Sequence, residues 1–318
     1  MLLSVEYMHI PDGFLSIFVS FVAWIISIAM VAYAIHRVGK ELGERQVPMM
    51  GVLAAAIFAG QMLNFAVAGG TSGHLMGSAL AAILMGPWAA ILIMTSVVSI
   101  QALIFQDGGL IVLGANIFNM AVLGVAVAYM VYRSGLKILG NTRRGILVSG
   151  FSAAWISIFI AALSVGLQLA LSGTSPVRLA IPAMAGVHAL IGIGEGLITV
   201  GALVFLMSVR PGVIHSGEPR MAGDRFVMIV GFVLAVLLVI AAPLASTKPD
   251  GLEWVAMQGG FISQAGEPLY QIIPDYLLPG VANESIATIA AGLLGVVIML
   301  GLAFGFVYSR RMRHISGR

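Results

Sequence analysis

Long apolar runs are the feature that most restricts how this chain can fold. Seven of them contain at least 20 residues each, at positions 14–36, 48–68, 110–132, 145–171, 179–209, 226–245 and 285–308. A helix of about 20 apolar residues crosses a bilayer core of about 30 Å. Only 9% of the residues are charged, against about 25% in soluble domains. The sequence therefore predicts an all-α polytopic membrane protein.

An eighth apolar stretch, 75–105, decides how often the chain crosses the membrane. If it crosses twice, with a turn at Gly86-Pro87, then 14 of the 16 Lys and Arg residues fall on one face, and only Arg178 and Lys248 fall on the other. The positive-inside rule makes the basic face cytoplasmic. We therefore predict about nine transmembrane helices, with the N-terminus outside and the C-terminus in the cytoplasm.

The outer face is acidic under this topology. Its acidic residues are Glu6, Asp12, Asp107, Asp250, Glu253, Glu267, Asp275 and Glu284. Such a surface raises the local concentration of cations, although a simple lack of Lys and Arg in outer loops explains the same pattern.

The chain divides at a polar segment on the cytoplasmic side. Residues 210–225 contain Pro-Gly, Ser-Gly and Glu-Pro pairs, which are typical of a linker. We predict a first domain of about seven helices at 8–209 and a second domain of two helices at 226–318, called the accessory domain below. The accessory domain includes an outer segment, 246–284, between its two helices.

Missing motifs exclude several functions. The chain has no Cys, which excludes disulfides and thiolate metal sites, and it has no G-x-x-x-x-G-K-[ST] motif to bind ATP. The glycines of Gly192-Ile-Gly-Glu-Gly196 lie inside an apolar run, where close helix packing explains them better than a nucleotide site. The basic residues are spread between apolar runs, so they indicate topology and no nucleic-acid partner. Nothing suggests an enzyme: no pair of carboxylates, or of nucleophile and base, is recognisable.

Two histidines are predicted to lie on the outer face. His9 comes just before the first span, and His74 just before the stretch that begins at Leu75. Imidazoles without thiolates favour Ni²⁺, Co²⁺, Cu²⁺ or Zn²⁺ over Mg²⁺ or Ca²⁺. The alternative is that both are ordinary turn histidines, and that Asp12 only caps the first span.

His188 and Glu195 lie seven positions apart in the 179–209 run, and therefore on one face of a helix. An ionisable residue inside a span is costly unless it is paired or functional. The two side chains either orient the metal loop or hold helices together through Gln61, Asn64 or Asn116. We favour the structural role, because such polar pairs are common between membrane helices.

Three motifs stand out in residues 8–209: Met8-His-Ile-Pro-Asp-Gly-Phe14, Gly70-Thr-Ser-Gly-His-Leu75 and His188-Ala-Leu-Ile-Gly-Ile-Gly-Glu-Gly196. Together they resemble the substrate-capture component of nickel/cobalt energy-coupling-factor importers. A fourth motif, Pro249-Asp250-Gly251-Leu252-Glu253, resembles the signature of the small two-span accessory subunit of such importers, fused here at the C-terminus.

The resemblance implies a metal site made of four nitrogen atoms in a near-planar square. These are the amine of Met8, the backbone nitrogen and imidazole of His9, and the imidazole of His74. Strong nitrogen donors of this kind suit square-planar Ni²⁺. Because Met8 supplies a free amine, we expect translation to start there, or the preceding seven residues to be removed.

The resemblance also implies a role and partners. The chain would bind Ni²⁺ or Co²⁺ as the transported substrate, without a cofactor, in the cell membrane of a prokaryote. A transmembrane coupling protein and cytoplasmic ATPases would be its partners, and the accessory domain favours nickel over cobalt. The residues expected to support the site are Asn64, Thr71, Ser72, His188 and Glu195.

Two other readings remain open at this stage. One is a cobalt importer component that serves cobalamin synthesis. The other is a secondary metal permease that works alone, which would need ionisable residues along a path through the membrane. Glu195 is the only acidic residue within any apolar run, which speaks against that path.

Overall fold

The computed structural model describes residues 8–41, 46–209 and 225–316. The predicted linker at 210–225 and the predicted start at Met8 therefore depend largely on residues outside the described ones. The helices of the first domain are α1 (Ile17–Glu41), α2 (Val47–Gln61), α3 (Ser78–Ile104), α4 (Leu113–Asn116), a π-helix η2 (Ile117–Gly124), α5 (Val125–Leu139), α6 (Arg143–Leu171) and α7 (Val177–Val209). Two short strands, β1 (Phe65–Val67) and β2 (Thr71–Gly73), lie between α2 and α3.

The remaining described elements belong to the accessory domain. They are α9 (Arg225–Ala241), the 3₁₀ turn η3 (Ala242–Leu244), α10 (Gly251–Gly259), the 3₁₀ turns η4 (Ile262–Gln264) and η5 (Pro274–Tyr276), and α11 (Glu284–Ser316). Within the described part of the chain, seven helical segments are long and apolar enough to cross a membrane: α1, α3, the continuous segment from α4 to α5, α6, α7, α9 with η3, and α11. The apolar α2 is shorter, with 15 residues.

The end of α2 differs from the prediction that 48–68 forms one span. The helix stops at Gln61, and the chain continues into an antiparallel hairpin in which Phe65 pairs with Gly73. Gly69 and Gly70 make the turn with φ angles of 92° and 85°, which glycine adopts without steric penalty. The apolar residues after Gln61 therefore belong to a folded loop that carries His74.

Helix α3 turns back on itself at Gly86-Pro87. Gly86 has φ 76° and ψ 168°, which interrupts the helix. The side chain of Gln61 donates to the carbonyl of Met76 (2.9 Å) and accepts from the amide of Gln101 (2.8 Å). In a straight helix, positions 25 residues apart would be separated by about 37 Å. The stretch 75–105 is therefore a helical hairpin, with its turn at the predicted position.

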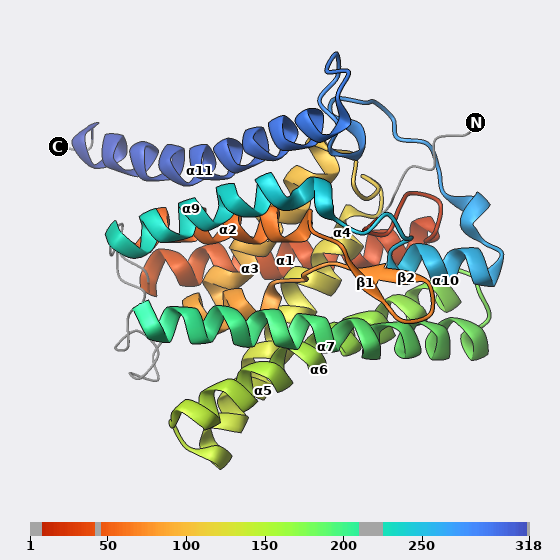
Figure 1. The fold of residues 1–318 in the computed structure, drawn as a ribbon, viewed down its shortest axis with the longest axis horizontal. Helices are drawn as coiled ribbons and strands as arrows, with labels where there is room; N and C mark the ends of the chain where they lie inside the picture. The colour runs from red at the N-terminus through yellow and green to blue at the C-terminus, as the bar shows by residue number, and fades with distance from the viewer. Residues whose placement is uncertain (1–7, 42–45, 210–224, 317–318) are drawn as a thin grey trace.

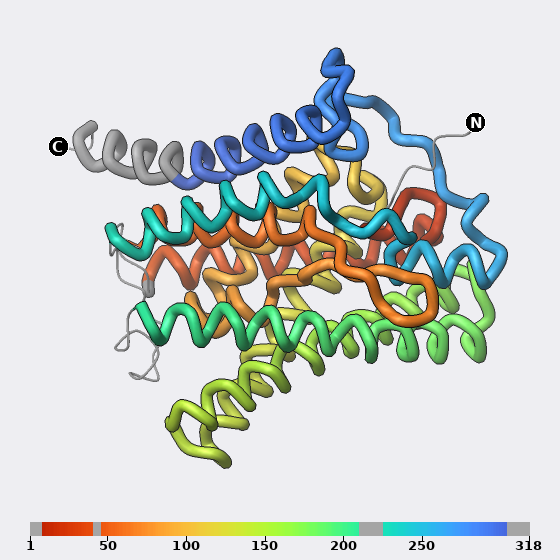
Figure 2. The backbone as a smooth tube through the Cα atoms, viewed as in Figure 1, coloured from red at the N-terminus to blue at the C-terminus, as the bar shows by residue number. Residues whose placement is uncertain are grey.

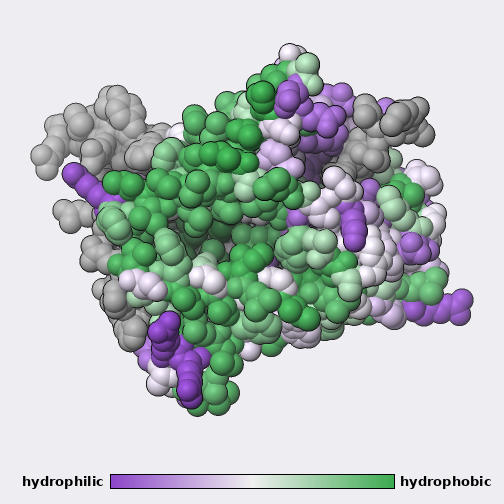
Figure 3. Space-filling view, in the orientation of Figure 1, coloured by the Kyte–Doolittle hydropathy of each residue, from purple (hydrophilic) through white to green (hydrophobic). Residues whose placement is uncertain are grey.

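Basic residues gather at one end of the helix bundle. Lys40 and Lys137 lie in the last turns of α1 and α5, while Arg143 and Arg225 begin α6 and α9. In Figure 1 these helix ends lie on the left, and β1, β2 and α10 lie on the right. Figure 3 shows a broad hydrophobic belt between hydrophilic patches at the two ends. The molecule is a multi-pass membrane protein.

The accessory domain packs directly on the first domain. Helices α9 and α11 both contact α2, whose small residues Ala55 and Ala59 are completely buried. A Cβ atom added at Gly51 would lie 2.4 Å from the Cβ of Ala303 in α11, so these helices approach closely. Figure 2 shows the outer segment running along the end of the bundle opposite the basic one before the chain enters α11.

The glycines of Gly192-Ile-Gly-Glu-Gly196 pack against aromatic rings. A Cβ at Gly194 would lie 2.3 Å from Phe65, and one at Gly196 would lie 2.6 Å from Phe151. Helix α7 therefore needs glycine to fit against β1 and α6, which confirms close packing as the reason for this motif.

Candidate metal site

A cavity of about 80 Å³ lies where the N-terminal segment, the loop before α3, α7 and the start of α10 meet. Among the residues that line it are Met8, His9, His74, His188 and Asp250. The imidazole centroids of His9 and His74 are 5.6 Å apart. The fold thus brings together three histidines that are distant in sequence.

His9 is almost completely buried, with 3% of its surface exposed. Its Nδ1 atom lies 2.9 Å from Oδ1 of Asp107, in the loop after α3. The same carboxylate oxygen accepts the backbone N–H of Met8 at 3.1 Å. Among the described residues, the Nε2 atom of His9 is buried and has no hydrogen-bond partner. The Met8 nitrogen and Nδ1 of His9 therefore both face Oδ1 of Asp107.

Asn116 of α4 fixes the backbone next to His9. Its Oδ1 accepts the N–H of Ile10, and its Nδ2 donates to the carbonyl of Ile10, both at 3.1 Å. The carbonyl of Ile10 also accepts the N–H of Gly109. These bonds satisfy buried backbone groups and hold the N-terminal segment in one position.

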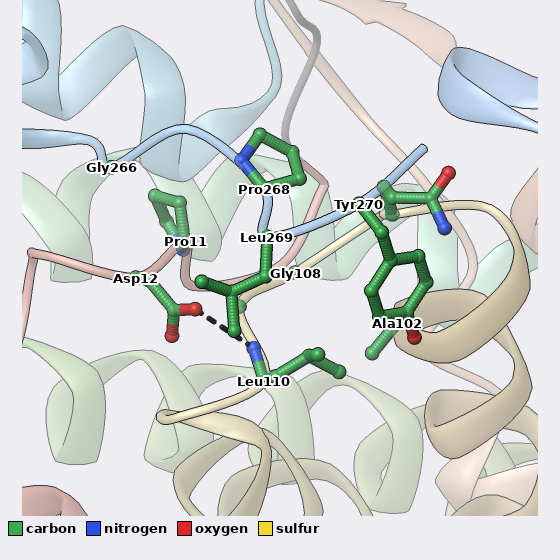
Figure 4. Close-up of a pocket in the computed structure, with 11 residues that line it drawn as sticks. Pro11, Asp12, Ala102, Gly108, Leu110, Gly266, Pro268, Leu269 and Tyr270 are labelled. Carbon is green, nitrogen blue, oxygen red and sulfur yellow. Dashed lines mark hydrogen bonds between the residues drawn. The ribbon is translucent and has the colours of Figure 1, made fainter. Parts of the chain in front are cut away.

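Asp12 bonds to the backbone before α4 and not to the start of the first span, which was the alternative reading of this residue. Its carboxylate accepts backbone N–H groups from Leu110, Ile111 and Val112, at 2.9 to 3.2 Å, just before α4 rather than at the start of α1. Figure 4 shows the bond to Leu110, with Leu269 beside it and Pro268 and Tyr270, also of the outer segment, nearby. A long-range contact has replaced the local cap, because the segment runs along α4 before α1 begins.

Replacing Asp12 by Ala leaves these N–H groups without their acceptor. We expect a loss of about 1–3 kcal/mol in the free energy of unfolding, the usual effect of removing a shared acceptor. Thermal unfolding in detergent measures it. Asp12→Asn is the matched control, since its amide oxygen still accepts hydrogen bonds and the loss should be smaller. Equal stability of Asp12→Ala and the unaltered chain would contradict the capping role.

Glu195 of α7 anchors the loop that carries His74. Its carboxylate is fully buried and accepts the N–H groups of Met76 (2.7 Å) and Gly77 (3.0 Å). None of the predicted partners of Glu195 is used: Gln61 pairs with Gln101, and Asn116 holds Ile10. The acid connects α7 to the loop backbone instead of connecting two helix side chains.

His188 lies two helical turns before Glu195 on α7. Its Nδ1 lies 2.9 Å from the carbonyl oxygen of Met184, so Nδ1 carries the proton and Nε2 keeps a lone pair. Like Glu195, it uses none of the predicted amide partners. Its ring lies beside the start of α10, because a Cβ added at Gly251 would lie 3.1 Å from its Cε1 atom. Any larger residue at Gly251 would crowd this histidine.

The motif at 249–253 docks on the strand before His74. The carbonyl of Pro249 accepts the N–H of Ser72 (2.8 Å) and the hydroxyl of Thr71 (3.1 Å). The hydroxyl of Ser72 donates to the backbone carbonyl of Lys248 (2.8 Å). Asp250 occupies the N-cap position of α10 without a capping bond from its side chain. Its Oδ1 lies 3.3 Å from Nδ1 of His74.

Two further residues of the motif, Leu252 and Glu253, are buried at the start of α10, and Asn64 lies apart from the histidines. Leu252 lines the histidine cavity, and Glu253 is buried in the first turn of α10. The carbonyl of Asn64 accepts the N–H of Ser246 at 2.8 Å. Asn64 lines a second cavity, of about 360 Å³, which Met8 also lines. The structure therefore does not bring Asn64 together with His9 and His74.

The contacts between imidazoles and carboxylates shift the pKa values of two loop residues, Asp107 and His74. Burial raises the pKa of Asp107, but the His9 imidazole and the hydroxyl of Tyr276 outweigh it, and the pKa falls below its usual value. Burial lowers the pKa of His74, but the Asp250 carboxylate outweighs it, with Asp107 and Glu195 adding to the rise. The contacts of Asp107 with His9 and of Asp250 with His74 therefore favour the charged forms of Asp107 and His74.

Sequence reasoning gave no individual role to Asp107 or Tyr276. The phenol of Tyr276 donates to Oδ2 of Asp107 at 2.7 Å, across 169 sequence positions. The only available signal was that Asp107 belongs to the acidic outer face. In the described part of the chain, no three side chains of His, Cys, Asp or Glu form a group that could hold a metal ion.

The fold and the cavity define a class: a polytopic membrane protein with a buried site rich in nitrogen donors at one end of its helix bundle. Comparison with known families gives its membership. The chain belongs to the family described as the cobalt uptake substrate-specific transmembrane region, which matches residues 9–213. A second match, to the PDGLE domain, covers residues 225–312.

Relatives match nearly the whole chain. A putative fused nickel transport protein NikMN of Archaeoglobus fulgidus is 38% identical over 309 residues, which is 95% of this chain and 99% of the relative. A cobalt transport protein CbiM of Geobacter sulfurreducens is 31% identical and covers 82% of this chain and 80% of its own length. A crystal structure described as a transition metal transporter matches with a TM-score of 0.58 and 33% identity, over 66% of this chain and 97% of that one.

Proposed function

We propose that this chain captures Ni²⁺ at the outer membrane face and delivers it inward as the capture component of an ATP-driven energy-coupling-factor importer. The observation that carries the proposal is that Met8, His9 and His74 line one cavity, with the two imidazole centroids 5.6 Å apart. Relatives named as nickel and cobalt transport proteins support metal uptake. Separate ATPase subunits and a transmembrane coupling protein supply the energy.

The proposed ligands are the nitrogen atoms of Met8, His9 and His74. The Met8 nitrogen and Nδ1 of His9 lie 3.1 Å and 2.9 Å from the same carboxylate oxygen, Oδ1 of Asp107, so the two residues are held side by side. Thr71, Ser72 and Glu195 support the site by holding the loop of His74. In the proposed arrangement Met8 is the first residue of the mature chain, since a free amine is a better donor than an amide nitrogen.

The proposed topology has nine crossings, with the N-terminus outside and the C-terminus in the cytoplasm. The helical hairpin at Gly86 and the gathering of basic helix ends support it. The proposed domains are 8–209 and 226–318, joined by the linker at 210–225. The histidine cavity lies at the end opposite the basic one, which is the outer end under this topology.

Metal content of the purified protein tests this function directly. Chains beginning at Met1 and at Met8 are exposed to equal Ni²⁺ and Co²⁺, washed and analysed. We expect about one metal ion per chain for the Met8 form and less for the Met1 form, because the Met8 nitrogen of the longer form is an amide. The bound ion should be mainly nickel, because the preference of nitrogen donors follows the Irving–Williams order. Preferential cobalt binding would assign the chain to cobalt import, and no bound metal in either form would contradict the proposed site.

Uptake by cells separates the proposed importer from a permease that works alone. The chain is expressed with and without its coupling protein and ATPases. We expect accumulation of nickel only with the partners present. Equal accumulation by the chain alone would favour the secondary permease.

A further inference from the structure

The Asp107 carboxylate joins the N-terminal segment to the accessory domain. One oxygen, Oδ1, accepts the N–H of Met8 and lies 2.9 Å from the imidazole of His9. The other, Oδ2, accepts the phenol of Tyr276 at 2.7 Å. With 3% of its surface exposed, this carboxylate is cut off from competing water. The orientation of His9 therefore depends on a hydroxyl from the other domain.

Tyr276 is held firmly where it makes this contact. Its ring stacks on Phe105, with centroids 4.8 Å apart and planes inclined by 15°, and it lies 6.1 Å from the ring of Phe58. Tyr276 and its neighbour Asp275 have φ angles of 56° and 53°, a left-handed conformation that is unfavourable for residues with a Cβ atom. Strain of this kind persists only where the surroundings impose it, and it is concentrated at functional sites.

The outer segment holds the Asp107 loop at several further points. Ile272 donates its N–H to the side chain of Gln106 at 3.0 Å, and Ile273 donates to the carbonyl of Ile104 at 3.0 Å. These two bonds fix the backbone of the segment, so the Tyr276 hydroxyl meets Asp107 in one geometry. Tyr270 is 38% exposed, and its phenol donates to the carbonyl of Leu103 in α3 at 2.9 Å, outside the contacts with Gln106 and Asp107.

A second residue of the accessory domain, Asp250, contacts the imidazole of His74 directly. Asp250 is 95% buried, with 5% of its surface exposed, and its Oδ1 lies 3.3 Å from Nδ1 of His74. Its backbone forms a β-bridge with Ser72, two residues before the histidine. The carboxylate and the imidazole loop are thus fixed to each other through both backbone and side chain.

We propose that Tyr276 and Asp250 are positioning residues through which the accessory domain orients the two imidazoles of the metal site, Tyr276 through Asp107 and Asp250 directly. The inference rests on the proposed function. Metal-binding histidines are oriented in this way by carboxylates that hydrogen-bond to the ring, and loss of such a partner weakens metal binding about 10–100-fold. The metal site is therefore shared between the two domains.

The test uses single-atom changes in the complete chain. Tyr276→Phe removes the hydroxyl and keeps the ring on Phe105, while Asp250→Asn keeps the size of the side chain and removes its charge. Tyr270→Phe is the matched control, because it removes the other phenol of the outer segment that donates a hydrogen bond. Ni²⁺ affinity and the visible absorption of bound nickel are measured in the form, starting at Met1 or Met8, that binds metal. Thermal unfolding without metal is measured in parallel.

We expect Tyr276→Phe and Asp250→Asn each to weaken nickel binding about 10–100-fold and to shift the absorption band. Tyr276→Phe leaves the buried Oδ2 of Asp107 without its donor and should therefore unfold at a somewhat lower temperature, whereas Asp250→Asn should unfold close to the unaltered chain. Both variants should stay folded at the temperature of the binding measurement. Tyr270→Phe should leave both metal readouts unchanged. Unaltered affinity and spectrum in both variants would overturn the inference alone, and so would an equal loss in Tyr270→Phe. Absence of nickel binding in the unaltered chain would overturn the proposed function and this inference with it.

Discussion

Replacement of His74 by Ala is expected to abolish stable nickel binding, and replacement of His9 by Ala should do the same. Each histidine supplies a ligand to the proposed site, and both rings lie beside one cavity with centroids 5.6 Å apart. The loss should exceed the roughly 10–100-fold effect of changing a residue that only positions a ligand. Equilibrium dialysis with Ni²⁺, followed by elemental analysis, measures it.

Two other histidines provide controls for this prediction. His36 is exposed near the basic end of α1, so His36→Ala should bind nickel like the unaltered chain. His188 lines the cavity, but its Nδ1 is held by Met184, and His188→Ala should lower affinity less than His74→Ala. Undiminished binding by the His74 variant would remove that residue from the ligand set.

Glu195→Ala is expected to have the second largest effect, on both stability and metal binding. The change leaves the buried N–H groups of Met76 and Gly77 without an acceptor, at a cost of about 1–3 kcal/mol for each group. Because Met76 follows His74 by two positions, loosening of this loop should also weaken nickel binding. Thermal unfolding and nickel dialysis of the same preparation measure the two effects.

Ser208→Ala is the matched control for Glu195. Ser208 lies on the same helix, and its exposed hydroxyl only donates to the carbonyl of Val204. It should leave both measurements unchanged. If Glu195→Ala behaved like this control, the acid would have no part in anchoring the loop.

The sequence was sufficient to predict features that depend on composition along the chain. Charge placed the turn at Gly86-Pro87, and the hydrogen bonds of Gln61 to both arms confirm the reversal. The apolar runs predicted the helices, and the glycines of α7 were correctly assigned to packing. Each of these inferences uses either local periodicity or a rule that holds for all membrane proteins.

The sequence was insufficient where function depends on which loops meet. The end of α2 was misjudged, because the residues after Gln61 are as apolar as a span but fold into a hairpin. Capping of the first span was one reading of Asp12, and its carboxylate accepts N–H groups just before α4 instead. Tyr276 reaches Asp107 across 169 positions, and no periodicity within a segment encodes such a contact. Long-range hydrogen bonds between loops can be identified only once the three-dimensional fold is known.

The covalent junction between the two domains lies at the opposite end of the bundle from the contact between α10 and the β-hairpin. Helix α7 ends and α9 begins at the basic end of the bundle, while α10 and the β-hairpin lie at the opposite end (Figure 1). A stretch of 15 residues connects these two helix ends. Because both matched regions lie in one chain, each copy of the first domain is accompanied by one PDGLE domain, and the covalent connection lies at the end of the bundle opposite β1, β2 and α10.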